Sequence, residues 1–473
     1  MSSTGNPYLE GDFGPVQEEH TVADLAVTGE LPGYLDGRYL RNGPNPVGSV
    51  DPATYNWFLG TGMVHGLRLR DGRAEWYRNR WVRSRDVAAT LGEPAPTGPV
   101  HAGMDFAANT HVIGHAGRTL ALVEAGALPY ELDAELGTIG SCDFDGTLPG
   151  GYTAHPLRDP ATGELHAVSY YWGWGNKVQY SVIGTDGRVR RTVDIEVSGS
   201  PMMHAFSLTE RHVVIYDLPV SFDLTKVSAA PAAVSSVISK VVGRLGMPDR
   251  VASRLNGSPS IGGFPYTWNP DYPARVGVLP RDGAAAGVRW FDVEPCYVYH
   301  PLNAYDEEGG IVLDVTRHPK TFATEQRGPS EGPPTLDRWT IDLSGGKVRE
   351  ERLDDRGQEF PRMDERLVGR RHRYGYAVAF DGELGNALLK HDLVSGRTET
   401  RSFAAGCELD EFLFVPADGD AGEDDGVVMG FVYDGSTDRS ALVVLDAATL
   451  EDCGRVDLPG RVPHGFHGSW IPS

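Results

Sequence analysis

The sequence predicts an all-β protein whose sheets close on themselves, as they do in a propeller or a barrel. Short β-rich runs occur along the whole chain, and 59 glycines and 33 prolines supply the turns between them. Long stretches of helical periodicity are scarce. With 473 residues, the chain is too long for one small core. It forms either two or three ordinary domains or one large closed architecture.

The strand-like runs are rich in β-branched and aromatic residues, which favour half-buried strands. The clearest runs are Thr119–Val123, Val213–Tyr216, Gly310–Val315, Trp339–Leu343, Tyr374–Phe380, Val427–Tyr433 and Ala441–Leu445. Asp-Gly pairs between the runs predict hairpin turns, because both central residues of the tight two-residue turn need positive φ. These pairs are Asp71-Gly72, Asp145-Gly146, Asp186-Gly187 and Asp381-Gly382. No clean motif repeats along the chain, so periodicity alone does not indicate a propeller.

The stretch Thr225–Asn256 has helical spacing instead. Apolar residues recur there at steps of three and four, at Val234, Val237, Ile238, Val241, Val242 and Leu245. Basic residues accompany them, at Lys226, Lys240, Arg244, Arg250 and Arg254. The stretch is either an ordinary helix packed on the outside of the β-structure or an apolar lip that touches a membrane or a lipid-like substrate.

We expect a single domain over residues 1–473, because no linker divides the chain. The N-terminus to about Gly33 is interpreted as an arm that wraps this domain. A cap insertion is expected over residues of about 222–262. The acidic, glycine-rich stretch Ala417–Asp425 is expected to be a solvated loop.

The overall charge excludes some classes of partner. The chain carries 43 basic and 65 acidic residues, a formal net charge of -22, which argues against nucleic acid and against electrostatic docking on anionic lipid. Four cysteines without a CxxC pair argue against a zinc ribbon. Residues Met1–Glu19 show no signal peptide, and no apolar run is long enough to span a bilayer. We expect a cytoplasmic protein whose association with a membrane, where it occurs, is peripheral.

Four histidines that lie far apart in the chain share one setting. Each is flanked by small, proline or apolar residues at the edge of a strand-like run. They are His155 in Ala154-His155-Pro156, His204 in Met203-His204-Ala205, His300 in Tyr299-His300-Pro301 and His467 in Gly465-Phe466-His467-Gly468. Histidine is the commonest metal ligand among side chains. A metal held from four such points would tie the end of the chain to its middle.

Other motifs accompany these histidines in a recognisable order. They are Arg41-Asn42-Gly43-Pro44-Asn45-Pro46, the run from Trp57 to Gly66, Asn109-Thr110, Glu124 with Pro129-Tyr130-Glu131-Leu132, His300-Pro301-Leu302-Asn303-Ala304-Tyr305, Glu359-Phe360-Pro361 and Glu411-Phe412-Leu413-Phe414-Val415-Pro416. With these motifs and the terminal Gly465-Phe466-His467-Gly468, the chain resembles the carotenoid cleavage oxygenase family. The resemblance runs from about Leu31 to Trp470.

The resemblance implies an all-β, seven-bladed propeller with a helical and loop cap over its top face and one non-haem Fe(II) per chain. His155, His204, His300 and His467 would hold the iron. Three glutamates would stand behind these ligands, Glu124 at His204, Glu359 at His300 and Glu411 at His467, and His155 would have no glutamate partner. A carboxylate in that position fixes the tautomer and orientation of the ligating ring.

The resemblance also implies a reaction. The protein would be a dioxygenase that splits one C=C bond of a carotenoid or apocarotenoid into two carbonyl products, so its partners would be a lipophilic polyene and O2. Aromatic residues would line the substrate tunnel, and the candidates are Phe58, Trp172, Phe264, Tyr266 and Trp268. Each of these is alternatively an ordinary core or rim aromatic. The Thr225–Asn256 stretch is the candidate surface for dipping into a membrane.

Two departures from the family pattern bear on this interpretation. The family's F-D-G-D-G-M motif reads Phe58-Leu59-Gly60-Thr61-Gly62-Met63 here, so both acids are absent and the local turn is in question. Val123 stands where stilbene-cleaving members tend to have a lysine that binds the phenol, which disfavours such substrates. His464 replaces a usual aromatic residue and is expected behind the ligands or at the rim, while His65 is expected to pack near the propeller centre.

The sequence leaves three alternative functions open. The same iron site can act on a stilbene-type or isoeugenol-type aromatic alkene. The same scaffold can catalyse isomerisation, alone or coupled to oxygenation. A propeller can also be a non-catalytic protein that binds a partner through its loops.

Overall fold

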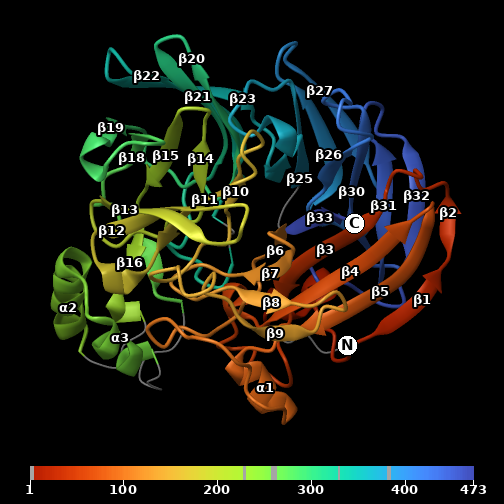
Figure 1. Ribbon diagram of the computed structural model, residues 1–473, viewed down its shortest axis with the longest axis horizontal. Coiled ribbons are helices and arrows are strands. Elements are labelled where there is room, and N and C mark those ends of the chain that lie inside the picture. Colours follow the sequence, from red (N-terminus) through yellow and green to blue (C-terminus); the bar gives the residue numbers. More distant parts are fainter. Residues whose placement is uncertain (1–4, 227–230, 257–263, 329–330, 381–384) are drawn as a thin grey trace.

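Seven β-sheets are arranged around a common centre in the computed structural model, as the blades of a propeller (Figure 1). The model describes residues 5–226, 231–256, 264–328, 331–380 and 385–473. Within these residues most of the regular structure is strand, so the predicted seven-bladed β-propeller is confirmed.

The blades follow one another along the chain, and neighbouring strands within them are antiparallel. The first blade contains β1 (Thr21–Leu25), β5 (Arg73–Trp81), β4 (Gly62–Arg70), β3 (Gly37–Pro44) and β33 (Gly468–Pro472). The second contains β6 (His111–His115), β7 (Arg118–Leu122), β8 (Tyr130–Leu132) and β9 (Thr138–Ser141). The third contains β10 (Leu157–Arg158), β11 (Leu165–Tyr170), β12 (Lys177–Ile183) and β13 (Val189–Glu196).

The next two blades lie in the middle of the sequence. The fourth contains β14 (Phe206–Leu208), β15 (His212–Asp217), β18 (Arg275–Pro280) and β19 (Arg289–Asp292). The fifth contains β20 (Pro301–Glu307), β21 (Gly310–Arg317), β22 (Thr335–Asp342) and β23 (Lys347–Asp354).

The last two blades complete the circle. The sixth contains β24 (Gln358–Arg362), β25 (Tyr374–Phe380), β26 (Gly385–Asp392) and β27 (Arg397–Ser402). The seventh contains β2 (Val27–Gly29), β32 (Asp452–Asp457), β31 (Arg439–Asp446), β30 (Gly426–Asp434), β28 (Cys407–Leu409) and β29 (Leu413–Pro416). All the strand-like runs predicted from the sequence fall within or overlap these strands.

The burial of the strands follows their place in a blade. Middle strands such as β21 and β30 are buried on both faces, because each blade is packed between two others, and their sequences are nearly continuous apolar runs. Outer strands such as β23 and β27 are mostly exposed and carry charged residues, which protects open sheet edges from pairing with another chain. The first strands of neighbouring blades contact one another near the centre.

The two ends of the chain close the circle together. The C-terminal strand β33 pairs with β3 of the first blade, with Arg41 opposite Gly468. Near the N-terminus, β1 pairs with β5 of the first blade and β2 pairs with β32 of the seventh. Both ends of the chain therefore hold the first and last blades in place. The closure also fixes the position of the loop that precedes β33.

The predicted Asp-Gly turns differ in their geometry. Asp71-Gly72 joins β4 to β5 with positive φ at both residues, as expected for a tight hairpin. Asp145-Gly146 also has positive φ at both residues but lies in the connection after β9, away from any hairpin, where Asp143 accepts the Gly146 N–H. At Asp186-Gly187, between β12 and β13, only the glycine has positive φ. Asp381-Gly382 lies outside the described residues.

The remaining elements decorate the propeller. Two helices, α2 (Ala232–Leu245) and α3 (Asp249–Asn256), occupy the stretch with helical spacing and project from one side near the two-stranded sheet of β16 (Val220–Phe222) and β17 (Tyr266–Trp268) (Figure 1). The described residues contain one further α-helix, α1 (Arg85–Leu91), which Ser84 caps. Short 3-10 turns are η1 (Pro7–Leu9), η2 (Gly11–Phe13), η3 (Trp57–Leu59), η4 (Trp172–Trp174), η5 (Leu224–Lys226), η6 (Ala285–Gly287) and η7 (Glu365–Leu367).

Candidate metal centre

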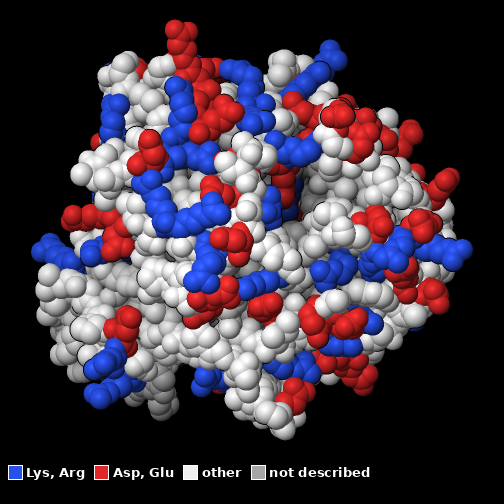
Figure 2. Space-filling view, viewed as in Figure 1, with Lys and Arg blue, Asp and Glu red and all other residues white. Residues whose placement is uncertain are grey.

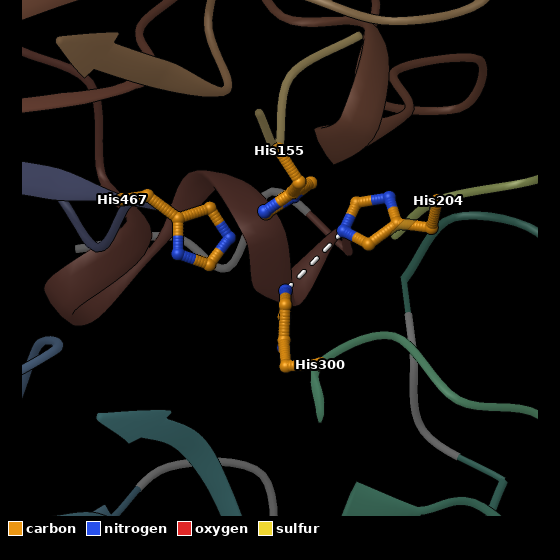
Figure 3. Close-up of side chains that lie close together, drawn as sticks. All are labelled: His155, His204, His300 and His467. Atoms are coloured by element: carbon orange, nitrogen blue, oxygen red, sulfur yellow. Dashed lines mark hydrogen bonds between the residues drawn. The ribbon is translucent and has the colours of Figure 1, made fainter. Parts of the chain in front are cut away.

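The four histidines singled out in the sequence converge on one point (Figure 3). His155, His204, His300 and His467 each lie one or two residues before the first or closing strand of a blade, namely β10, β14, β20 and β33. One nitrogen from each ring lies within 4.8 Å of the others. The Nε2 atoms of His204 and His300 are 3.2 Å apart, which is the contact drawn in Figure 3.

The rings are packed against one another, and His204 and His467 are buried while His155 and His300 are partly buried. The ring centroids of His155 and His204 are 4.3 Å apart, those of His155 and His467 4.5 Å, and those of His300 and His467 4.6 Å. Burial, reinforced by the neighbouring rings, holds the pKa of His155 and of His467 well below the ordinary value for histidine. Both rings are therefore neutral near pH 7, which is the form that binds a metal.

Carboxylates stand behind three of the rings. Glu359 Oε2 lies 2.6 Å from His300 Nδ1, Glu411 Oε1 lies 2.9 Å from His467 Nδ1, and Glu124 Oε2 lies 2.9 Å from His204 Nδ1. Among the described residues, no carboxylate lies within ion-pair distance of His155. The resemblance predicted these same pairs from the sequence.

Each of the seven blades contributes one of these seven side chains. The first, third, fourth and fifth blades bring the histidines, whereas Glu124 follows β7 of the second blade, Glu359 lies on β24 of the sixth and Glu411 precedes β29 of the seventh. Such a site forms only when the whole propeller has closed.

Glu359 has additional partners that sequence reasoning did not single out. Its Oε1 accepts hydrogen bonds from His318 Nε2 at 2.7 Å and from the Thr316 hydroxyl at 3.1 Å. Burial opposes ionisation of Glu359, but His300 and His318 outweigh it and hold the pKa of the carboxyl well below its usual range. His318 stands in no motif that marks it as a site residue. Its place on the loop just after β21, one residue past Arg317, gave no distinguishing signal.

Arg362 is a second contributor that the sequence analysis passed over. Its guanidinium lies 3.6 Å from Glu411 Oε1 and donates to the Gly468 carbonyl at 3.0 Å. Glu411 Oε2 also accepts the Gly468 N–H at 2.9 Å. The loop that carries His467 is thus held by an acid and a base from two other blades. Arg362 follows the Glu359-Phe360-Pro361 motif by one residue, and that proximity is the signal that could have identified it.

The donor set fits a divalent transition metal. The Nε2 atom of His155 is buried and has no hydrogen-bond partner in the described part of the chain, as expected for a lone pair reserved for a metal. Imidazole nitrogens suit iron, copper, nickel and zinc, whereas calcium and magnesium prefer oxygen ligands. The carboxylates behind the rings offset the charge of a cation that four neutral ligands leave uncompensated.

The histidines open onto a large cavity of about 830 Å³, a size typical of small-molecule sites. His204, His300 and His467 form part of its wall, together with Glu124 and Glu359. Four of the five aromatic residues predicted for the tunnel line this cavity, namely Phe58, Trp172, Phe264 and Tyr266. Trp268 does not line it, although it packs against the core beside it.

The two departures from the family pattern also lie at the cavity. Val123 is buried and lines the wall next to Glu124, so no cationic group stands at that position. In the altered Phe58–Met63 motif, Thr61 takes part in holding the turn, because its hydroxyl donates to the Asn45 carbonyl at 2.8 Å and accepts the Val47 N–H at 3.1 Å. The Asn109 side-chain amide donates to the carbonyls of Phe58 and Gly60.

The other histidines have structural partners. His65 is buried and its Nδ1 lies 2.9 Å from the Tyr77 hydroxyl. His111 lies behind the candidate ligands, with its ring 5.5 Å from that of His467 and its nitrogens facing the carbonyls of Ala154 and Gly468. His464 lines the cavity and contacts two buried aspartates.

The fold and these four rings define a β-propeller protein with a four-histidine candidate metal site. Residues 13–472 match the family model described as retinal pigment epithelial membrane protein. A carotenoid cleavage oxygenase of Mycobacterium tuberculosis is 55% identical, with 99% of this chain and 98% of that protein covered.

Solved structures agree with the sequence matches. The lignostilbene dioxygenase of Pseudomonas brassicacearum has a TM-score of 0.84 at 28% identity, with 99% of each chain covered. A variant of the Synechocystis apocarotenoid oxygenase has a TM-score of 0.81 at 26% identity, with 97% of each chain covered. The chain belongs to the carotenoid cleavage oxygenase family, and it is a dioxygenase.

Proposed function

We propose that this protein binds one Fe(II) through His155, His204, His300 and His467 and cleaves one C=C bond of a carotenoid or apocarotenoid into two carbonyl products. The observation that carries the proposal is the opening of a four-imidazole cluster directly onto an aromatic cavity. The reaction balances without a further reductant, because the two oxygen atoms of one O2 become the two carbonyl oxygens.

His155, His204, His300 and His467 would hold the ferrous iron, which would supply the means of activating dioxygen. The protein's own residues supply the geometry. Glu359 and Glu411 hold the Nδ1 atoms of His300 and His467 by hydrogen bonds, so the Nε2 atoms of these rings face inwards with their lone pairs available. Glu124 lies 2.9 Å from His204 Nδ1 and places a negative charge behind that ring. The lowered pKa values of His155 and His467 keep these rings unprotonated at neutral pH.

The cavity wall favours an extended apolar substrate. In this wall the ring centroids of Phe58 and Phe264 are 5.7 Å apart, and the fully buried Phe322, which does not line the cavity, packs on Phe264 at 4.5 Å. Trp172 stacks on Phe222 at 5.1 Å on another part of the wall. Flat aromatic faces bind a planar conjugated chain along its length and exclude water. The position at which the chain stops in the cavity then decides which double bond lies at the metal centre.

The similarity to the lignostilbene dioxygenase favours one other function, cleavage of a phenolic aromatic alkene at the same centre. Val123 argues against it, because valine provides no charge or hydrogen bond for a phenol in the cavity wall. Mass spectrometry of the products separates the two functions, since the alternative yields aromatic aldehydes.

We further propose that the exposed apolar face of α2 contacts a membrane, from which the cavity takes its lipophilic substrate. Val237 and Leu245 are 62% and 82% exposed, and Val234, Ile238 and Val241 form the same stripe. In Figure 2 much of the surface over α2 is uncharged, whereas charged side chains are visible over α3. None of the helices in the described ranges is long and apolar enough to cross a bilayer.

The test of the enzymatic proposal uses the full chain, purified without oxygen and loaded with Fe(II). β-Carotene and a panel of apocarotenals in detergent are then exposed to air, and the visible absorbance is followed. Bleaching that requires iron, with carbonyl products that carry label from isotopic dioxygen, supports the proposal. The His300→Ala variant serves as the control without a complete ligand set. If the iron-loaded protein bleaches no polyene but cleaves a phenolic alkene, the proposed substrate class is wrong. A protein that binds no iron contradicts the whole proposal.

A further inference from the structure

The first residues described in the chain form part of the cavity wall. Tyr8 in η1 and Phe13 in η2 line the cavity, although they precede the first blade and lie more than 450 residues before His467 in the sequence. Tyr8 and Phe13 are 3% and 9% exposed. Asn6 anchors the segment, because its side-chain amide donates to the carbonyls of Pro52 and Tyr55.

These two rings join a cluster of aromatic residues that leads towards the metal centre. The Phe13 ring meets that of Trp57 edge-on at 5.2 Å, and Tyr8 stacks on Trp57 at 5.9 Å. Trp57 contacts Phe466 at 4.4 Å, and Phe466 immediately precedes the candidate ligand His467. The N-terminal segment is therefore continuous with the wall beside the ligand.

A buried ion cluster fastens this segment to the C-terminal loop. His464 Nδ1 lies 3.1 Å from Asp12 Oδ2 and 3.1 Å from Asp410 Oδ1. The Asp12 carbonyl also accepts the His464 N–H at 2.9 Å. Arg41 is paired with Asp410 and donates to the carbonyl of Pro463. Asp12 is 4% exposed, and removing one partner of such a buried pair leaves an uncompensated charge.

The protonation of His464 fits an ion pair. Burial disfavours its charged form, but the hydrogen bond with Asp12 and the charge of Asp410 outweigh burial and raise the pKa of His464 above its ordinary value. Burial also raises the pKa of Asp12 above its ordinary value, against the hydrogen bond and charge of His464, which lower it. With Arg41, the cluster brings two basic and two acidic side chains together. The His464 ring also packs on Phe13 at 5.0 Å and on Trp57 at 5.8 Å, so the ion pair and the aromatic wall are one assembly.

Two consecutive acids connect this assembly to the metal centre. Asp410 contacts His464 and accepts the Gly465 N–H at 3.3 Å, while Glu411 contacts His467 and accepts the Gly468 N–H. The first half of the loop 464–468 therefore contacts the ion cluster that holds the N-terminal segment. Its second half contacts Glu411, the acid behind His467.

We infer that the N-terminal segment is a specificity-determining wall of the substrate cavity, with Phe13 contacting the substrate and the Asp12–His464 ion pair acting as the positioning contact. This inference rests on the proposed function, because it assigns to the segment a choice among polyenes. A wall formed by an anchored segment limits how far a polyene extends past the metal centre. Loosening or trimming the wall favours longer substrates over shorter ones.

The test compares Phe13→Ala, which shortens the wall and leaves the ion pair intact, with Asp12→Asn, which removes the charge and keeps the shape. β-Carotene is the long probe and all-trans-retinal the short one. We expect both variants to raise the ratio of kcat/KM for β-carotene over retinal by about 10-fold, the order expected when a hydrophobic pocket changes by one or more carbon groups. The change lies mainly in KM, and iron content stays at the wild-type level. Glu18→Gln, an exposed acid just beyond the segment, is the matched control and leaves the ratio unchanged.

A binding measurement that needs no turnover accompanies the kinetics. Polyene binding is followed by quenching of tryptophan fluorescence, and the same shift in preference is expected in Kd. Equal losses for both probes, or a Phe13→Ala variant with the wild-type ratio, overturn the inference and leave only a structural clamp. If the Asp12→Asn variant does not fold, the Phe13→Ala variant still tests the inference. If the wild-type protein binds both probes but cleaves neither, only the proposed cleavage reaction is contradicted. If it binds neither probe, both the cleavage reaction and the inferred role of the N-terminal segment are contradicted.

Discussion

Glu411 shows how one carboxylate orders a ligand and its backbone together. Oε1 accepts from His467 Nδ1 and Oε2 accepts from the Gly468 N–H, both at 2.9 Å. A carboxylate accepts on both oxygens, whereas an amide accepts on one side and donates on the other. In a Glu411→Gln variant, one N–H must therefore face an NH2 group, and the negative charge behind the ligand is lost.

We expect Glu411→Gln to weaken metal affinity or activity by about 10- to 100-fold, the effect typical of a partner behind a ligating histidine. The measurement is the iron retained after dialysis against a graded series of chelator concentrations, with turnover measured in parallel. Glu308→Gln, an exposed acid in the turn between β20 and β21, provides the control. Wild-type iron retention in Glu411→Gln would show that Glu411 does not support the ligand.

Individual site residues could be predicted where a motif marked them. The four histidines and three glutamates stand in motifs with distinctive neighbours, and the structure brings all seven together. His318, Arg362 and Asp12 could not be predicted in the same way. Each acts on a partner from another part of the chain, and the Asp12–His464 contact joins residues 452 positions apart. Ordinary charged residues in ordinary sequence surroundings acquire such roles only through the closure of the fold.

At the scale of single elements, α2 combines an anchored side with an exposed apolar stripe. Val242 packs with Tyr171 and Trp172, the Leu224 N–H donates to Ser239, and the Met247 N–H donates to the Gly173 carbonyl. The opposite side presents Val237 and Leu245 to the solvent. An exposed apolar stripe on an otherwise acidic protein marks an interaction surface.

We expect the double change Val237→Ser and Leu245→Ser to reduce binding to phosphatidylcholine vesicles by at least about 10-fold, since burying each such side chain contributes about 1.5–3 kcal/mol. Both residues are largely exposed, so the fold and the turnover of detergent-dispersed substrate stay unchanged. Co-sedimentation with vesicles provides the measurement. Val394→Ser is a matched control, because Val394 is 73% exposed in the turn after β26. Equal sedimentation of the double variant and the wild type would exclude α2 as the contact surface.

The helices and strands were easier to predict than their assembly. Helical spacing over Thr225–Asn256 is a local signal, and α2 and α3 fall within it. The number of blades had no local signal, because no sequence motif repeats from blade to blade. The pairing of β33 with β3 and of β2 with β32 depends on contacts between the two ends of the chain. Without the family resemblance, the sequence indicated only a closed all-β fold.

At the scale of the whole molecule, the closed propeller buries several histidines whose pKa values are lowered. Burial lowers the pKa of His111, His166, His372 and His391 to about 4 in each case. It also lowers the pKa of His65, His155 and His467 well below the ordinary value. In the unfolded chain these rings titrate near pH 6.5. Between these values the unfolded chain therefore takes up protons that the folded chain does not.

The metal-free protein should consequently lose stability as the pH falls below about 6.5. Stability falls because the unfolded state binds more protons than the folded state, so its free energy drops relative to that of the folded state. Each such histidine contributes about 1.4 kcal/mol per pH unit within its window, against a total stability of about 5–15 kcal/mol for a typical protein. His464 has the opposite sign, since its raised pKa favours the folded state at pH values below that pKa.

Thermal unfolding followed by circular dichroism at pH 7.5, 6.5, 5.5 and 4.5 measures the balance. We expect the midpoint to fall progressively below pH 6.5 and to fall less in a His391→Gln variant, since Gln keeps a side-chain donor and acceptor at the buried Gln358 contact. Carboxylates with lowered pKa values lose their charge only at more acidic pH, so a midpoint that stays constant from pH 7.5 to 5.5 would contradict the histidine mechanism.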